Sequence, residues 1–307
     1  MTFQPFAPAE IEAALDQRYI VGPEIDVGGQ GAVFRATRTY RPDGTETSDI
    51  VALKLHFHPG QAIRVQREIT ALENLSHPAS ARLIEHGYCQ VAGRHTRYIA
   101  YEFVEGQSLK HRLRSGRLLE SEVLRIGRDV STAIAALWSQ RIVHGDIKPS
   151  NIMLRDSGGA VLIDLGVARY LEEDAAPRPF RPFGDSSPER TRVWGTLGYM
   201  SPEQARGQRP LSCASDIFSL GVVLLESIQG WHPTNHDQSA LADGIRASGR
   251  RLTVSGGLLS TLDMMLLARP PRSRGRLAKL SGYFQMLEQR MEEESARGGR
   301  ASQKAQG

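Results

Sequence analysis

Hydrophobic and polar residues alternate through much of the first third of the chain. This period of two predicts strands, because successive side chains of a strand face opposite sides of a sheet. A helical period interrupts the alternation at residues 61–75, and a His-Pro pair just beyond marks its end. Five strands are expected, at residues 19–27, 32–38, 50–57, 82–89 and 96–103.

Beyond residue 106 the apolar period becomes helical. Residues 118–140 form the longest amphipathic stretch, and residues 214–229 are apolar almost throughout, which predicts a buried helix. A short amphipathic helix is also expected near the N-terminus, with Ile11, Ala14 and Leu15 on one side. The pattern therefore predicts a sheet-rich region followed by a helical one.

Two segments show neither period. Residues 170–194 contain several prolines, which exclude regular structure and predict a long loop. Residues 293–307 are rich in Ser, Gly, Ala, Gln and Arg, and we expect them to form a disordered tail.

Composition and charge exclude several classes of protein. The 307 residues are 40% hydrophobic and 23% charged, as in soluble globular proteins. A net charge of only +4, without a long basic run, argues against nucleic-acid binding as the main role. Cys89 and Cys213 are isolated, so neither a disulfide framework nor a zinc site is expected. With no leader segment and no apolar run of membrane-spanning length, we expect a cytoplasmic protein.

Glycines between the first two predicted strands allow backbone N–H groups to approach a phosphate. Residues 28–31 read Gly-Gly-Gln-Gly. An ordinary hairpin turn would use the same residues. Lys54 ends the next apolar strand, and Glu68 on the following helix can pair with it and aim it at phosphate. Taken singly, a lysine that snorkels from a strand end and a glutamate on a solvated helix face are the better explanations.

The second half of the chain has a denser polar cluster. Residues 144–151 read His-Gly-Asp-Ile-Lys-Pro-Ser-Asn, and an apolar strand and a turn lead to Asp164. Asp146, Lys148, Asn151 and Asp164 are thus expected on loops at the ends of short strands. Carboxylate and amide oxygens are ligands that Mg²⁺ prefers, and lysine neutralises phosphate charge. A capping Asp or a turn Asn would explain each residue singly.

In this order and spacing, the motifs resemble those of Ser/Thr protein kinases. Residues 195–203, Gly-Thr-Leu-Gly-Tyr-Met-Ser-Pro-Glu, resemble the end of that family's activation segment, with Ser201 in place of the usual alanine. Asp216 resembles the family's buried helix aspartate, and Arg274 resembles the arginine that pairs with Glu203. The joint order outweighs the separate explanations of the single motifs.

The resemblance implies an α+β fold with two lobes. The N-lobe, a five-stranded antiparallel sheet with one helix, would span residues 19–105, and the mainly helical C-lobe residues 106–287. The activation segment would span residues 164–203. Residues 1–18 would be an N-terminal extension, and residues 288–307 would be the end of a helix and the disordered tail. The motif style and the Ala- and Arg-rich composition resemble bacterial, Hanks-type members.

The resemblance also implies transfer of the γ-phosphoryl group of ATP to Ser or Thr of protein substrates, including the kinase itself. Asp146 would accept or orient the substrate hydroxyl. Lys148 would contact the γ-phosphate, and Thr196 would hydrogen-bond near both residues. Protein substrates are therefore the expected partners, and nucleic acid is not.

Cofactor and nucleotide ligands follow from the same resemblance. Lys54, paired with Glu68, would hold the α- and β-phosphates, while Asn151 and Asp164 would hold Mg²⁺ or Mn²⁺. Tyr101 would be the gatekeeper residue that narrows the rear of the nucleotide pocket. The nucleotide would also contact Ile25, Gly28, Gly29, Gly31, Val33, Ala52, Glu102, Val104 and Met153.

Besides Ser201, three further positions depart from the family pattern. Asp26 stands where the family has its first loop glycine, and its charge is expected to weaken ATP binding unless it faces solvent. Gly145 replaces the arginine that meets a phosphate on the activation segment, so we expect activity without that phosphate. Leu165 replaces the usual Phe.

These departures leave a nucleotide-binding pseudokinase or scaffold as the main alternative. A kinase-fold enzyme for small molecules is a third reading. It is disfavoured by residues 195–203, which resemble a peptide-docking platform.

Overall fold

The computed structural model of the chain describes residues 6–28, 31–40, 44–56, 62–165, 169–170, 195–208, 211–249, 252–266 and 277–304. The chain divides into two compact units. The first comprises residues 1–105 and 164–168, and the second comprises residues 106–163 and 169–307. Of the loop predicted at residues 170–194, Tyr170 belongs to a short strand instead, and residues 171–194 lie outside the described residues. Gly29 and Arg274 also lie outside them.

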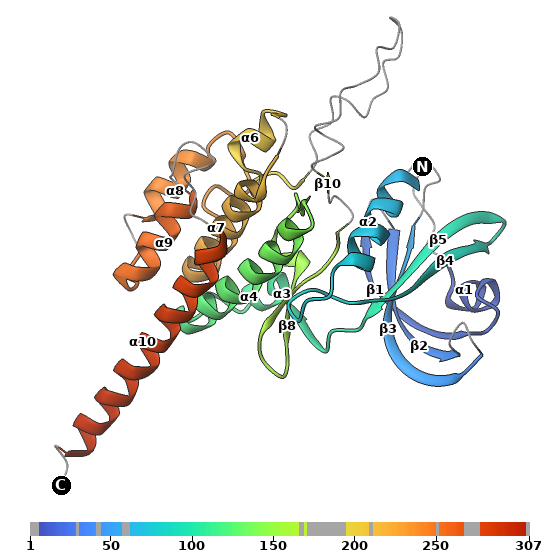
Figure 1. Cartoon of the computed structure of the whole chain (residues 1–307), viewed down its shortest axis with the longest axis horizontal. Coiled ribbons are helices and arrows are strands. Elements are labelled where there is room, and N and C mark those ends of the chain that lie inside the picture. The colour runs from blue at the N-terminus through green and yellow to red at the C-terminus, as the bar shows by residue number, and fades with distance from the viewer. Residues whose placement is uncertain are drawn as a thin grey trace, which may run out of the picture. The chain divides into compact units, whose positions relative to one another are not determined.

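The first unit is built on an antiparallel sheet with strand order β1-β2-β3-β5-β4 (Figure 1). The predicted class, α+β with a five-stranded antiparallel sheet and a helical remainder, is confirmed. The strands are β1 (Tyr19–Gly28), β2 (Gly31–Tyr40), β3 (Glu46–His56), β4 (Leu83–Val91) and β5 (Arg94–Glu102).

Strand β3 begins four residues before the predicted start. The hairpin with β2 continues outward, pairing Arg38 with Asp49 and Tyr40 with Glu46. An ion pair of 2.7 Å between Arg38 Nη2 and Asp49 Oδ2 supports this extension. Because the added residues are polar and partly exposed, they show no alternation with apolar positions.

Two helices cover different faces of the sheet (Figure 1). Helix α1 (Pro8–Ala14) buries Ile11 in one core with Phe34 of β2 and Leu53 of β3. Helix α2 (Ala62–Asn74) is tied to the other face, since its Glu68 bonds to Lys54, the neighbour of Leu53 in β3. The sheet face that carries Lys54 is therefore the one next to α2, and it also carries the polar cluster described below.

The second unit is mainly helical, as predicted. Its long helices α4 (Glu120–Ser139) and α7 (Cys213–Gln229) confirm the two main predicted helices. Ser212 caps the start of α7, and Gly230 ends it with a left-handed φ of 90°. The remaining elements are β6 (Gly106–Ser108), α3 (Leu109–Leu113), β7 (Ile142–Val143), the 3-10 turn η2 (Pro149–Asn151), β8 (Ile152–Arg155), β9 (Ala160–Leu162), β10 (Arg169–Tyr170), α6 (Pro202–Ala205), α8 (Leu241–Gly249), α9 (Gly256–Leu266) and α10 (Leu277–Lys304).

The predicted disordered tail is wrong for residues 293–304, because α10 continues through Lys304. Its first half is anchored on α4: Phe284 is fully buried against Gly127, and Arg128 Nη1 lies 2.6 Å from Glu288 Oε2. From such an anchor, a run rich in Glu, Arg, Gln and Ala extends the helix at little cost. The polar composition of residues 293–304 suggested disorder, but the high helix propensity of these residues explains why they continue the helix.

Among the residues that the structure describes, no helix is both long enough and apolar enough to cross a membrane.

Candidate active site

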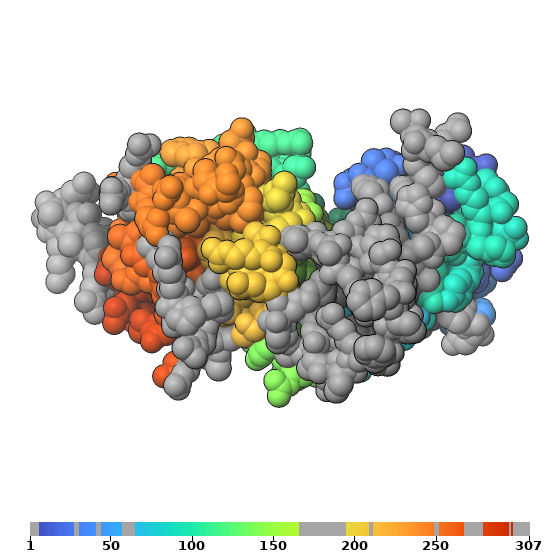
Figure 2. Space-filling view, turned by 90° about the horizontal axis from the view of Figure 1, so that it is seen from above, coloured from blue at the N-terminus to red at the C-terminus, as the bar shows by residue number. Residues whose placement is uncertain are grey.

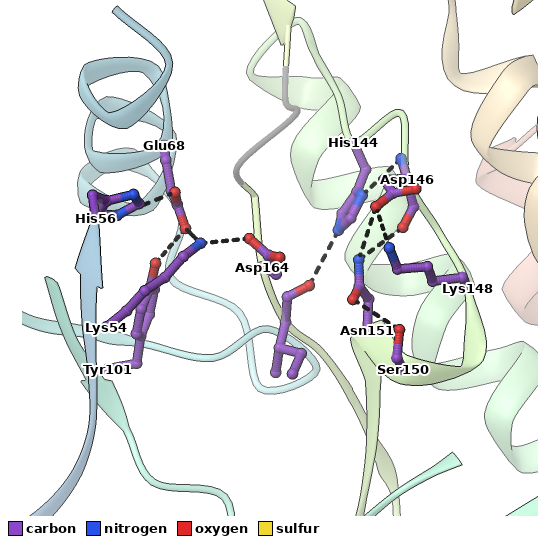
Figure 3. A network of polar contacts seen from close by, with 11 residues as sticks. Lys54, His56, Glu68, Tyr101, His144, Asp146, Lys148, Ser150, Asn151 and Asp164 are labelled. Carbon is purple, nitrogen blue, oxygen red and sulfur yellow. Dashed lines mark hydrogen bonds and ion pairs between the residues drawn. The ribbon is translucent and has the colours of Figure 1, made fainter. Parts of the chain in front are cut away.

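A buried ion cluster joins the predicted phosphate-binding residues of the first unit (Figure 3). Lys54 Nζ lies 2.9 Å from Glu68 Oε1 and 2.8 Å from Asp164 Oδ1. Lys54 is 6% exposed and Glu68 is 1% exposed. The alternatives of a snorkelling lysine and a solvated glutamate are therefore excluded.

The cluster keeps its lysine charged. Burial by itself lowers the pKa of Lys54, but the carboxylates of Asp164 and Glu68 outweigh burial and raise it above its usual value. Burial raises the pKa of Glu68, while Lys54 opposes that rise. A buried charge of this kind is stable only beside its partners, so the three side chains act as one unit.

Two further side chains contact Glu68 and were not predicted to do so (Figure 3). The phenol of Tyr101 donates a hydrogen bond to Glu68 Oε1, and His56 Nε2 lies 3.9 Å from Glu68 Oε2. Burial and the charge of Glu68 hold the pKa of Tyr101 well above its usual value, so the phenol remains a donor. Strand alternation was the available signal, since His56 lies two residues after Lys54 on the same face.

Strand pairing places other predicted nucleotide residues on the Lys54 face. Val33 lies opposite Lys54, and Ala52 lies opposite Tyr101. Both small side chains are half-buried. Glu102 ends β5, and Val104 follows it as a buried residue.

The glycine region forms the turn end of the β1–β2 hairpin. Gly28 pairs with Gly31, and a Cβ on Gly31 would lie 2.0 Å from the carbonyl oxygen of Leu55, so only glycine fits there. Ile25 is 49% exposed, and Asp26 is exposed beside it at a register shift in β1. Asp26 thus meets the condition under which its charge interferes least with a bound phosphate.

The second unit brings Asp146, Lys148 and Thr196 together in one hydrogen-bonded group. Thr196 Oγ1 donates to Asp146 Oδ1 at 2.7 Å. Lys148 Nζ donates to Asp146 Oδ2 at 2.8 Å and to Thr196 Oγ1 at 2.9 Å. The threonine hydroxyl therefore accepts from the lysine while donating to the carboxylate, which fixes all three side chains.

Asn151 is attached to the same loop (Figure 3). Its Nδ2 donates to the main-chain oxygen of Asp146 at 2.9 Å, which orients the amide. The turn η2 carries Asn151, and β8 directly after it carries the predicted nucleotide residue Met153, which is half-buried. The predicted polar residues of this loop are thus assembled by local main-chain contacts.

Two side chains of the second unit bind main-chain groups at the start of the loop that carries Asp146. Asp216 of α7 accepts hydrogen bonds from the amides of His144 and Gly145, each at 2.9 Å. Gln204 Nε2 donates to the carbonyl of Gly145 at 2.6 Å. Gly145 has a φ of 76°, which favours glycine. Asp216 was predicted only as a buried aspartate, and Gln204 was missed, although it directly follows the Ser-Pro-Glu motif.

Glu203, the predicted partner of Arg274, is nearly buried and accepts a hydrogen bond of 2.9 Å from Ser215 Oγ.

The two predicted metal ligands supply hard oxygen donors. Asp164 offers a carboxylate whose side chain is 35% exposed, and Asn151 offers an amide oxygen whose nitrogen is already bound to the Asp146 carbonyl. This chemistry fits Mg²⁺ or Mn²⁺. The two residues belong to different units, and the described residues hold no group of three or more His, Cys, Asp or Glu able to bind a metal ion.

Comparison with known proteins agrees with the motifs. The protein kinase domain family matches residues 19–257. The serine/threonine-protein kinase PknB of Mycobacterium tuberculosis is 28% identical over 272 residues, covering 86% of this chain and 42% of that protein. The probable serine/threonine-protein kinase PknB of Lactococcus lactis is 29% identical, covering 75% and 34%. The serine/threonine-protein kinase pkn2 of Myxococcus xanthus is 33% identical, covering 71% and 25%.

This chain thus spans less than half the length of those relatives. The family match covers both the Lys54 cluster and the Asp146 loop, and it confirms the resemblance inferred from the motifs. The chain belongs to the protein kinase domain family.

Proposed function

We propose that this chain is an ATP-dependent protein kinase that phosphorylates Ser or Thr of protein substrates. The observation that carries the proposal is the bonding of Asp146 to both Lys148 and Thr196 in a chain of this family. The three relatives described above, each named a serine/threonine-protein kinase, support the same class of acceptor. Autophosphorylation is part of the proposal.

In the proposed reaction, the substrate hydroxyl oxygen bonds to the γ-phosphorus of ATP. The bond from that phosphorus to the β–γ bridging oxygen breaks, and ADP leaves. Asp146 orients the hydroxyl and takes its proton, while Lys148 stabilises charge on the transferred group. Thr196 holds both side chains in place by the hydrogen bonds already present.

Lys54 is proposed to bind the α- and β-phosphates. Glu68 and Tyr101 fix the position of its ammonium group, so the cation is preorganised rather than recruited on binding. By resemblance, adenine contacts are assigned to Ile25, Val33, Ala52, Glu102, Val104 and Met153. Phosphate contacts through main-chain N–H groups are assigned to Gly28, Gly29 and Gly31.

Asn151 and Asp164 are the proposed ligands of Mg²⁺ or Mn²⁺. When bound, the ion neutralises charge on the β- and γ-phosphates. Asp164 also accepts a hydrogen bond from Lys54, so its carboxylate would serve both the lysine and the metal ion.

Phosphate-independent activity remains a proposal for this chain. Gly145 lacks a side chain, yet both its amide and its carbonyl are bonded, by Asp216 and Gln204. These buried contacts order the loop without a phosphate. The proposed limits of the two lobes are residues 19–105 and 106–287. A cytoplasmic location is also proposed, because both cysteines are free and the reaction needs ATP.

The test is transfer of labelled γ-phosphate from ATP, with Mg²⁺, to the protein itself and to a histone mixture. Asp146→Asn is expected to lower the rate about a thousandfold, the scale of lost general base catalysis, without unfolding the protein. Asp164→Ala serves as a second inactive variant. Unchanged transfer in both variants would refute the proposal. Absent transfer with ATP-dependent thermal stabilisation would instead support the nucleotide-binding pseudokinase.

A further inference from the structure

The segment that follows α7 is bonded to the main chain just beyond Thr196. We call residues 232–238 the clamp segment and residues 196–200 the docking segment. Gln238 contacts the docking segment twice: its Oε1 accepts from the amide of Gly198 at 2.9 Å, and its Nε2 donates to the carbonyl of Met200 at 3.0 Å. One amide side chain thus spans three residues of the docking segment.

His232 holds the other polar group of Gly198. Its Nε2 lies 3.1 Å from the carbonyl oxygen of Gly198. Its Nδ1 accepts from the amides of Thr234 and His236, at 3.2 Å and 2.9 Å. An Nδ1 that accepts carries no proton in a neutral ring, so Nε2 carries the hydrogen and donates to Gly198.

Burial keeps this ring neutral. Burial, together with a smaller effect of the neighbouring ring of His236, lowers the pKa of His232 to about 4, although the hydrogen bond to Gly198 opposes this shift. The ring therefore stays uncharged at neutral pH, which preserves both of its roles as acceptor and donor.

The clamp segment and the docking segment are in close contact at Gly198. Gly198 has a φ of 88°, and a Cβ there would lie 2.8 Å from His236 Cα and 3.0 Å from the His232 ring. The next residue is fixed as well, since Ser219 Oγ donates to the carbonyl of Tyr199 at 2.8 Å. In the space-filling view the yellow surface near residue 200 adjoins the orange surface that follows α7 (Figure 2).

One exposed apolar side chain lies within the docking segment. Leu197 is 61% exposed and lies between Thr196, which is bonded to Asp146, and the clamped Gly198. The main chain of the docking segment is thus held at Asp146 on one side and by the clamp segment on the other. By the family resemblance, residues 195–203 form a peptide-docking platform, so a peptide that presents its hydroxyl to Asp146 is expected to contact this stretch.

We propose that His232 and Gln238 are positioning residues, which fix the docking segment and thereby set how a peptide is presented to Asp146. The inference rests on the proposed kinase function. It assigns substrate selection to a segment outside the catalytic motifs. It also predicts that loss of the clamp affects the peptide more than the nucleotide.

Gln238→Glu is the most selective test. The new carboxylate still accepts from Gly198, but it has no hydrogen to donate and sets an oxygen against the carbonyl of Met200. Asn235→Asp is the matched control, because it makes the same chemical change at an exposed position of the same segment. Both variants are compared with wild type on a Ser/Thr peptide library in which one flanking residue is fixed at a time.

We expect Gln238→Glu to raise the KM for the best library peptide about tenfold, as for one buried hydrogen bond left unmade. Its KM for ATP should stay within about twofold of wild type, and its preference for flanking residues should weaken. Asn235→Asp should match wild type. His232→Gln, which keeps a donor but loses the ring contacts, should show the same peptide effect more weakly.

The outcomes separate the inference from the function on which it rests. If wild type transfers no phosphate to any peptide or to itself, the kinase proposal fails and the inference fails with it. If wild type is active but Gln238→Glu keeps its peptide KM and its preferences, the inference alone is overturned. A variant that loses thermal stability and affinity for ATP and peptide equally would also overturn it, since the role would then be structural.

Discussion

The two polar clusters of the candidate site hold their lysines in different ways. Lys54 has a 7% exposed side chain and contacts two carboxylates directly. Lys148 has a 25% exposed side chain and shares its carboxylate with a threonine hydroxyl. Lys54 and Glu68 thus form a buried ion pair beside the partly exposed Asp164, whereas the ammonium group of Lys148 is more open to solvent and therefore to a substrate.

This difference in burial predicts different costs for removing a charged side chain from each cluster. Removing one member of a buried pair leaves an unpaired charge in a medium of low polarity, which is costly. Removing a member of a partly exposed pair costs little, because water replaces it. The first cluster should therefore contribute to stability and activity together, and the second mainly to activity.

Substituting each lysine with methionine tests that contrast most strongly. Lys54→Met is expected to lower the free energy of unfolding by about 3 kcal/mol, because Glu68 loses its buried partner. Lys148→Met should lower it by less than about 1 kcal/mol. Both should abolish most transfer activity. Urea unfolding measures the stabilities, and equal losses in the two variants would contradict the contrast.

Tyr101→Phe makes a smaller change in the Lys54 cluster. Deleting the phenol oxygen leaves Glu68 with one hydrogen-bond partner fewer and lets Lys54 move. We expect kcat to fall about fivefold, equivalent to about 1 kcal/mol. Tyr98→Phe is the matched control: it removes a phenol of the same strand that donates to Glu85 at 2.6 Å, away from Lys54. A fall in kcat of the same size in both variants would argue against a specific role for Tyr101.

Asp26→Gly should have the smallest effect. The sequence alone predicts a lower KM for ATP, since the family has glycine at this position. The carboxylate is exposed, however, so we expect the KM to fall less than about twofold at low salt and not at all at high salt. Steady-state kinetics at two ionic strengths check this. A large fall that salt does not remove would show that Asp26 lies closer to the phosphates than its exposure indicates.

Much of the site could be predicted because its residues lie in short motifs. Asp146, Lys148 and Asn151 fall within one loop, and local main-chain contacts assemble them. Lys54 was expected in the third strand and Glu68 on the helix that follows, and the structure has both residues in those elements. Such short-range regularities survive in any sequence that keeps the fold.

The contacts that hold these motifs could not be predicted in the same way. Gln204 meets Gly145 across 59 residues, and Gln238 meets Gly198 across 40, with no periodic signal between them. Amide side chains also serve equally well on the surface, so their residue type gives no warning of burial. Only the folded chain shows that they bind main-chain groups.

The bond between Tyr101 and Glu68 also affects the choice of chemical tools. In the proposed nucleotide site, a tyrosine at this position excludes ATP analogues and inhibitors with bulky groups behind the adenine. Shrinking Tyr101 to glycine would admit such analogues and so allow direct substrate labelling, but it would also release Glu68. An analogue made for this kinase should therefore carry its own hydroxyl, aimed at the Glu68 carboxylate, to replace the phenol that the engineered enzyme has lost.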